Sequence, residues 1–246
     1  MKKKPLTTEE FLEQLANDPD YQKRLKERRE ELDRLHETRY QETIPLLKEL
    51  NAAGVKVEHI WDFMKLENGT YENAIPILMR HLKKEYSRLN INSIMRALAG
   101  ADPDPSVTRE LLQIYKSRKY KDDEVDHLIC SAVASTCTIE NLEEIKEILA
   151  DDSYGGSRAD LMMALVKLEP LKGIKKAITM IIKLLEEDRT SSESYISYVA
   201  MDILSKVNAY EARDLINTFT TDKRSDIRAM AKRVVKKFDK KLNINQ

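Results

Sequence analysis

The sequence predicts an all-α protein in which helical hairpins repeat along the chain, an arrangement known as an α-solenoid. Glycine and proline are scarce, at 6 and 7 of 246 residues, which favours helices joined by short turns. Hydrophobic residues make up 41% of the chain and charged residues 34%, enough for an extended core under a charged surface. In addition, one apolar pattern with helical spacing recurs every 31 to 39 residues.

The recurring pattern has an apolar residue at its fifth position and an apolar pair at its end. It occurs five times, as NINSIMRAL, VDHLICSAV, SRADLMMAL, ISYVAMDIL and IRAMAKRVV, with the end pairs Ala97-Leu98, Ala132-Val133, Ala164-Leu165, Ile203-Leu204 and Val234-Val235. A helix with one apolar stripe must bury that stripe against another element. We therefore expect each segment to be the second helix of a hairpin that stacks on its neighbours.

A first helix precedes each of these segments. The five candidates are AIPILMRHL, TRELLQIY, IENLEEIKEIL, IKKAITMIIKLL and AYEARDLINTF. Helix-start signals support this division into hairpins. Asp104 stands before Pro105, and Thr138 precedes an acidic first turn. Ser191-Ser192-Glu193 precedes the second helix of the fourth hairpin. The hairpins then cover about residues 71 to 242, and the predicted domains are a helical cap over 1–70 and a repeat domain over 71–246.

The first seventy residues lack this pattern. Thr7 and Glu10 form a possible capping box, and Asp18-Pro19 restarts a long, charge-dense helix. Its only strongly apolar residues before Ile44 are Leu25, Leu32 and Leu35, so we expect it to be mostly solvated and to contact the repeats along a thin seam.

The end of the cap has three further signals. Pro45 should kink or end the long helix, and Gly54 should stop it. The segment EHIWDFM then predicts a short helix whose Trp61 and Phe63 cover the open end of the first hairpin.

The repeated segments resemble HEAT repeats, which carry a proline in the first helix, an Asp in the turn and an Arg near the start of the second helix. Asp222, Ile227, Arg228 and Ala231 match this pattern, Asp152, Arg158 and Leu161 match it in part, and Pro76 resembles the first-helix proline. The resemblance implies a right-handed solenoid in which each Asp and Arg bond adjacent repeats. The phrases LTTEEFLEQLANDPDY and WDFM…YENAIPIL also resemble bacterial HEAT-repeat proteins that lack an assigned function.

Charge is uneven along the chain although the formal net charge is zero. Residues 122–152 hold ten carboxylates and one Lys, whereas residues 223–241 hold nine Lys or Arg and two Asp. The basic start of the chain lacks the apolar run of a signal peptide, and no apolar stretch is long enough to cross a membrane, so we expect a cytoplasmic protein that binds no membrane. Cys130 and Cys137 are expected to be buried thiols.

No motif for catalysis, a cofactor or a metal stands out, which predicts a non-enzymatic protein. The four His, at positions 36, 59, 81 and 127, lie in different elements, and His81 and His127 are interpreted as surface or satisfied interhelical residues. The run Asp122-Asp123-Glu124-Asp126 is explained by a helix start. The YGGSR segment at Tyr154 to Arg158 lacks the rest of a phosphate loop and is interpreted as a tight turn.

The expected function is that of a scaffold or regulator that binds a protein or peptide on the concave face formed by the second helices. The acidic centre favours a basic partner surface. The candidate contact residues point away from the apolar pairs: Asn92, Met95, Asp126, Ile129, Ser157, Asp160, Tyr195 and Tyr198.

The alternative is a nucleic-acid binder, or an enzyme like the HEAT-like DNA glycosylases. It would use the basic row Arg224, Arg228, Lys232, Lys236 and Lys240 to contact phosphates. The acidic middle hairpins, which would repel a duplex, and the position of Trp61 outside the repeats disfavour this alternative.

Overall fold

A computed structural model describes residues 7–65, 72–120, 122–169 and 173–242. Within these ranges the chain is entirely helical and contains no strand, so the predicted all-α class is confirmed. The predicted domain boundary between residues 70 and 71 falls outside the described residues. Among the described helices, none is both long and apolar enough to cross a bilayer.

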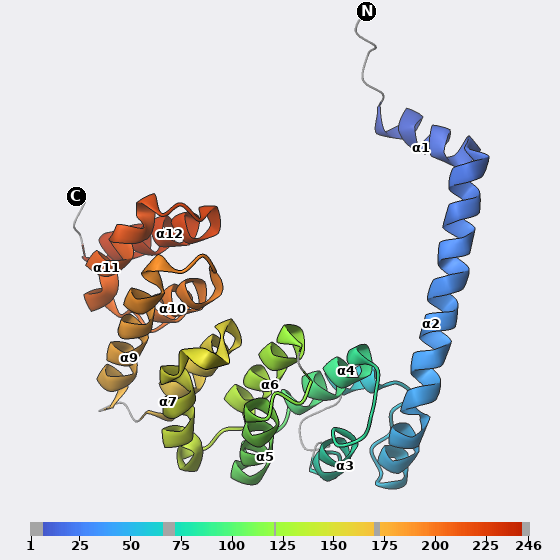
Figure 1. The fold of residues 1–246 in the computed structure, drawn as a ribbon, viewed down its shortest axis with the longest axis horizontal. Helices are drawn as coiled ribbons and strands as arrows, with labels where there is room; N and C mark the ends of the chain where they lie inside the picture. Colours follow the sequence, from blue (N-terminus) through green and yellow to red (C-terminus); the bar gives the residue numbers. More distant parts are fainter. Residues whose placement is uncertain (1–6, 66–71, 121, 170–172, 243–246) are drawn as a thin grey trace, which may run out of the picture.

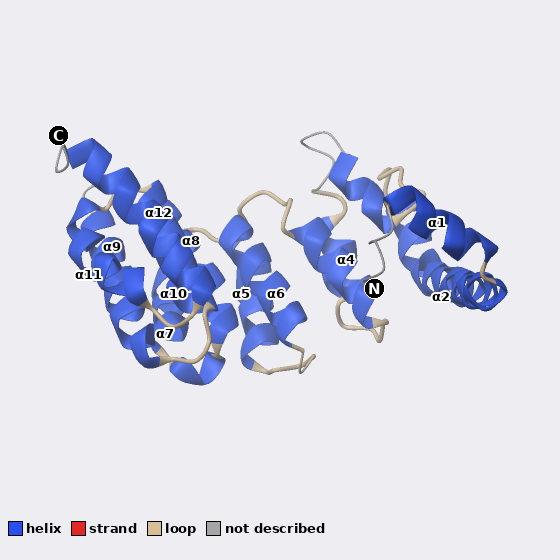
Figure 2. Ribbon diagram, turned by 90° about the horizontal axis from the view of Figure 1, so that it is seen from above, coloured by secondary structure: helices blue, strands red, loops and turns tan. Residues whose placement is uncertain are grey.

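Helices that are neighbours in the sequence follow one another along a curve (Figure 1). The outer side of the curve carries α3 (Ile75–His81), α5 (Pro105–Lys116), α7 (Leu142–Ala150), α9 (Ile174–Glu187) and α11 (Arg213–Thr218). The inner side carries α4 (Arg88–Leu98), α6 (Asp123–Thr136), α10 (Tyr195–Lys206) and α12 (Ser225–Leu242). Between α6 and α10 lie a 3-10 helix, η4 (Gly156–Leu161), and α8 (Met162–Leu168). Seen from above, the helices form a row that has α12 at one end and α1 and α2 at the other (Figure 2).

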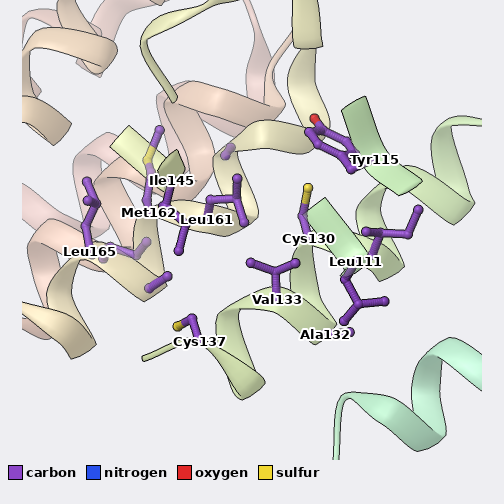
Figure 3. Packing of buried hydrophobic residues seen from close by; sticks show 14 of the residues in the cluster. Leu111, Tyr115, Cys130, Ala132, Val133, Cys137, Ile145, Leu161, Met162 and Leu165 are labelled. Carbon is purple, nitrogen blue, oxygen red and sulfur yellow. The ribbon is translucent and has the colours of Figure 1, made fainter. Parts of the chain in front are cut away.

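The inner helices contact one another in order along this row. α4 packs on α6, α6 on η4, η4 on α10, and α10 on α12. All ten residues of the predicted apolar pairs are buried, as are the fifth-position residues Ile94, Ile129, Leu161, Ala200 and Ala231. In Figure 3, Cys130 and Val133 of α6 lie between Leu111 of α5 and Leu161 of η4. Full burial of one leucine stabilises a fold by about 1.5–3 kcal/mol, so these contacts account for the stacking.

The helix starts agree with most of the predicted caps. Asp104 and Asp122 each accept two backbone N–H bonds at the starts of α5 and α6, and Thr138 forms a capping box with Asn141. Both cysteines are free and buried, as expected. The expected cap at Ser191 to Glu193 is wrong, because α10 begins only at Tyr195 and its N-cap residue makes no side-chain cap.

The third hairpin departs from the expected helix over SRADLMMAL. The first part of this segment belongs to the 3-10 helix η4, and only the part from Met162 onward, in α8, is α-helical. The cause is local, because Gly155 takes a positive φ of 69° and the chain turns there. The guanidinium of Arg158 donates to the carbonyls of Leu149, Asp152 and Gly155, which satisfies the end of α7 and the turn. The interpretation of YGGSR as a turn is thus confirmed.

The chain begins with α1 (Thr8–Asn17) and α2 (Pro19–Ala52), and the capping box of Thr7 with Glu10 is present. The long helix does not end at Pro45 but continues through it to Ala52. Its last turns bury Leu46, Leu47 and Leu50, which offsets the cost of about 3 kcal/mol for an internal proline. Gly54, at a φ of 85°, stops the helix as expected.

The long helix α2 is mostly solvated, as expected, but the expected seam between α2 and the hairpins is wrong for most of its length. From residue 7 to residue 42 no described residue is buried, and Leu25, Leu32 and Leu35 are 41%, 45% and 42% exposed. We call residues 19–42 of α2 the arm, because this part projects from the row of hairpins (Figure 1).

The short helix after the arm covers the first hairpin with only one of its two aromatic side chains. This element is the 3-10 helix η1 (Ile60–Lys65), which packs on α4. Phe63 is buried there as expected, but Trp61 is 54% exposed, so the expectation that Trp61 covers the hairpin is wrong.

Candidate partner-binding site

Three neighbouring hairpins meet at the carboxylate of Asp160, on η4. His127 Nδ1 of α6 lies 2.9 Å from Asp160 Oδ2, and the hydroxyl of Tyr195, on α10, donates to Asp160 Oδ1 over 2.5 Å. The rings of His127 and Tyr195 meet edge to face with centroids 4.4 Å apart. The interpretation of His127 as a satisfied interhelical residue is confirmed.

The same contacts shift the acidity of both partners of Asp160. Its hydrogen bond raises the pKa of His127 above the ordinary value, with further support from the charges of Asp160, Asp123 and Asp126, while burial opposes the rise. Burial, followed by the bond to Asp160, raises the pKa of the Tyr195 hydroxyl. Tyr195 therefore keeps its proton and serves as a donor that fixes the carboxylate.

A groove of about 360 Å³ opens beside Asp160. Its lining includes Ala134 of α6, Met163 of α8 and Tyr198, Val199 and Asp202 of α10. Met163 and Tyr198 are each 39% exposed, so apolar and aromatic surface is available to a ligand. Asp160 and Asp202 add carboxylates, and Asp202 is paired with Lys206 over 2.7 Å. The groove thus combines apolar and aromatic side chains with two carboxylates.

Of the eight predicted contact residues, the structure brings three to this region. Asp160 and Tyr198 line the groove, and Tyr195 adjoins it through Asp160. Met163 was missed by the sequence reasoning. The only signal for it is its position immediately after Met162 in the apolar stripe, where a helix turns the next side chain toward the surface.

The other five predicted contact residues are buried, namely Asn92, Met95, Asp126, Ile129 and Ser157. The premise that they point away from the core is wrong. Each inner helix packs on its outer partner and also on the inner helix of the next hairpin, so the buried face is wider than the apolar pair. Met95 and Ile129 therefore belong to the hydrophobic cluster.

Of the three polar members of this buried set, Asn92 and Ser157 join neighbouring hairpins, whereas Asp126 bonds within its own hairpin. Asn92 donates to Glu124 over 2.9 Å, and Ser157 bonds the hydroxyl of Tyr115 over 2.9 Å. Asp126 pairs with Arg118 over 2.6 Å, and burial raises the pKa of this carboxyl although Arg118 opposes the rise.

Arg118 belongs to the same network and has a left-handed φ of 50°. It also donates to the carbonyl of Ser153, and its guanidinium lies over the rings of Tyr115 and Tyr154 at 5.5 and 5.4 Å. These contacts hold the second hairpin to the third and stabilise the fold on which the groove is built.

Ion pairs already neutralise part of the acidic stretch 122–152. Among the described residues, five of its ten carboxylates pair with cations: Asp122, Glu124, Asp126, Glu143 and Glu144. Asp123, Glu140, Glu147, Asp151 and Asp152 remain exposed. The acidic surface that a partner would meet is therefore smaller than the sequence count indicates.

The expected Asp–Arg pairs between hairpins are wrong in their partners. Arg228 donates to the backbone carbonyl of Asp222 over 2.6 Å, within its own hairpin. The residue that reaches the previous hairpin is Arg224, which donates to the carbonyl of Glu193 over 2.5 Å and lies 3.7 Å from Asp188. The carboxylate of Asp222 binds this same guanidinium over 2.9 Å.

Two cations of the predicted basic row, which runs from Arg224 into α12, are likewise less accessible to a partner. Arg224 is buried and Arg228 is half-buried, while Lys232, Lys236 and Lys240 remain exposed. Across the described part of the chain, no three His, Cys, Asp or Glu side chains gather in a way that could hold a metal ion.

Comparisons of this chain with protein-family models, with curated proteins and with solved structures return no match.

Proposed function

We propose that this protein is a non-enzymatic scaffold or regulator that binds a protein or peptide in the groove beside Asp160. We further propose that the fold is a right-handed α-solenoid of five HEAT-like hairpins, closed at its N-terminal end by a helical cap. The ordered contacts between inner helices and the burial of all five apolar pairs support the solenoid. The Asp and Arg residues that resemble the HEAT pattern support the family.

The observation that carries the function is the composition of the groove. Met163 and Tyr198 offer partly exposed apolar surface in the same groove as two carboxylates, Asp160 and Asp202. Aromatic anchors in a depression are typical of protein-binding hot spots. Asp160 and Asp202 favour a partner that carries Lys or Arg beside its apolar side chain, because a carboxylate can accept hydrogen bonds from a second cation although His127 and Lys206 already pair with them.

The groove residues are held in place before a partner arrives. His127 and Tyr195 each bond one oxygen of Asp160, so binding need not order the carboxylate. A preorganised site loses less conformational entropy when it binds, which favours affinity for a small contact area.

Affinity capture from the source cell's lysate, with and without nuclease, tests this function. The wild type should recover a stoichiometric basic protein that resists nuclease. Tyr198→Lys should lose that protein, because the change removes the ring and adds a like charge toward the partner. Ile139→Lys is the matched control, since Ile139 is 58% exposed on η2 (Ile139–Asn141) and does not line the groove. Equal capture by both variants would contradict the proposal.

The second candidate is nucleic-acid binding, which the exposed row of Lys232, Lys236 and Lys240 favours. These residues follow one another at intervals of four on one face of α12, a spacing that suits contacts to phosphates. Recovery of DNA or RNA alone, lost at raised salt and abolished by replacing the three lysines with Glu, would favour this candidate over the scaffold.

A further inference from the structure

The arm carries an apolar stripe that nothing in the described structure covers. Leu25, Leu32 and Leu35 lie on it, together with Tyr21, Arg28 and Arg39. The steps between these six positions are 4, 3, 4, 3 and 4, which is the heptad spacing of a coiled-coil seam. A narrow seam of this kind packs against one other helix rather than against a broad hydrophobic core.

The stripe continues the face by which α2 is anchored to the hairpins. Thr43 lies 18 residues after Leu25, and Leu50 lies 18 residues after Leu32. Eighteen residues make five full turns, so each of these pairs lies on the same side of the helix. Thr43 and Leu50 are buried against the body, which means that the leucines of the arm face the same way but have no neighbour to cover them.

The charges along the arm indicate which helix covers this stripe. Residues 23–29 hold five cations and one Glu, whereas residues 30–37 hold four carboxylates and one Arg. Two arms placed antiparallel bring the basic block of each against the acidic block of the other. A parallel pair in register would place like charges together, so the arm is complementary to itself in the antiparallel direction only.

The antiparallel register also fits the length of the arm. Placing Leu25 opposite Leu35 of a second copy sets the two-fold axis at residue 30, close to the middle of the exposed segment 19–42. Arg28 then lies opposite Leu32 of the second copy, with its guanidinium near Glu31 of that copy. The overlap spans the whole arm, a length of about 36 Å at 1.5 Å per residue.

A groove at the foot of the arm lies where the start of the second copy would arrive. It has a volume of about 600 Å³, and its lining includes His36 and Tyr40 of α2, His59 and Trp61 near η1, and Asn90 of α4. In the same register the start of α2 from the second copy lies beside residues 39–43, and its α1 precedes that point. Phe11 and Leu12 of α1 are 50% and 58% exposed, and they supply apolar side chains that fit against the exposed Trp61.

We propose that two copies of this chain associate through antiparallel pairing of their arms, with α1 of each copy lying in the Tyr40–Trp61 groove of the other. This surface is separate from the groove beside Asp160, so its test does not depend on the proposed partner.

The mass of the full chain in solution is the first test. Multi-angle light scattering at tens of micromolar should give twice the 28.5 kDa of one chain. Leu32→Lys should reduce the mass to that of one chain, because it removes a leucine of the seam and places a second cation opposite Arg28 of the other copy. Arg34→Glu is the control and should leave the mass unchanged, since position 34 lies on the opposite side of the helix. A wild type with the mass of one chain, or equal dissociation by both variants, would overturn the proposal.

Cysteine cross-linking tests the direction of the pairing. Both natural cysteines are buried, so a thiol introduced on the arm is the accessible one. Leu25→Cys and Leu35→Cys should each stay uncross-linked alone under mild oxidation and should form a mixed disulfide dimer when combined. Circular dichroism confirms that each variant keeps its helices. Cross-linking of Leu25→Cys alone would show a parallel pair, and no cross-linking of the mixture would show that another helix covers the stripe; either result overturns the proposal.

Discussion

At the scale of single residues, Asp160 shows how one side chain can order the surface of three hairpins. Its two oxygens contact a histidine on one side and a tyrosine on the other, and both partners come from different hairpins. Protonation of His127 adds an ionic attraction to its contact with this carboxylate. Proton binding is therefore coupled to the packing of the site.

We expect His127 to make stability depend on pH. Its pKa in the folded protein is raised above the ordinary 6.5, so the charged ring stabilises the fold below about pH 6.5, and this contribution is lost as pH rises through the folded pKa. The fall in melting temperature from pH 6 to pH 8 should be larger for the wild type than for His127→Gln. His81, whose pKa is lowered by burial, acts in the opposite direction but is present in both proteins. An equal change in melting temperature in the two proteins would show that His127 does not contribute to the pH dependence.

At the scale of elements, the loops that join outer to inner helices hold consecutive hairpins together. Arg118, between α5 and α6, bonds the carbonyl of Ser153 after α7, and Arg224, before α12, bonds the carbonyl of Glu193 before α10. Arg224 is buried among Asp188, Asp222 and the carbonyl of Glu193. Charges in such a position stabilise only as a complete set, because removal of one leaves its partners desolvated and unpaired.

Replacement of this arginine should therefore be costly. We expect Arg224→Ala to lower the free energy of unfolding by about 3 kcal/mol. Arg228→Ala should lower it by about 1 kcal/mol, because Arg228 is half-buried and bonds only carbonyls of its own hairpin. Urea unfolding followed by circular dichroism measures both values. A larger loss for Arg228→Ala than for Arg224→Ala would contradict this expectation and would support the Asp222–Arg228 pair that the HEAT resemblance implies.

At the scale of the whole molecule, the arm and the body have different sources of stability. The core runs without interruption from Leu46 to Phe238, whereas the described residues before Thr43 bury no side chain. The arm is tied to the hairpins by the last turns of α2 and by Asn90, which donates to the carbonyl of Arg39 over 3.0 Å. The body should accordingly fold without the arm.

A chain that lacks residues 1–38 tests this independence. Its melting temperature should equal that of the full chain when both are measured at a dilution that disfavours self-association, since association itself raises apparent stability. Differential scanning calorimetry gives the comparison, and circular dichroism gives the helical content. Loss of the folding transition in the shortened chain would show that the arm supports the body.

Local patterns explain which features could be predicted from the sequence. Ala164 and Leu165 were expected in the core because helical periodicity alone identifies a buried stripe, and Asp104 was expected as a cap because a cap acts within three residues. The binding residues could not be predicted in this way. Met95 and Ile129 are covered by helices of other hairpins, and no local pattern reports how many neighbours a helix has.

The sequence by itself determined the helical class, the five buried pairs and the end of the long helix at Gly54, since each depends on residues close together in the chain. Only the tertiary structure decided that Arg224, not Arg228, reaches the previous hairpin, and that Trp61 and the leucines of the arm stay exposed. It also decided that Asp160 meets His127 and Tyr195 from 33 and 35 residues away. The physical reason is that burial and pairing depend on which surfaces meet in space, and the stacking of successive hairpins sets those meetings.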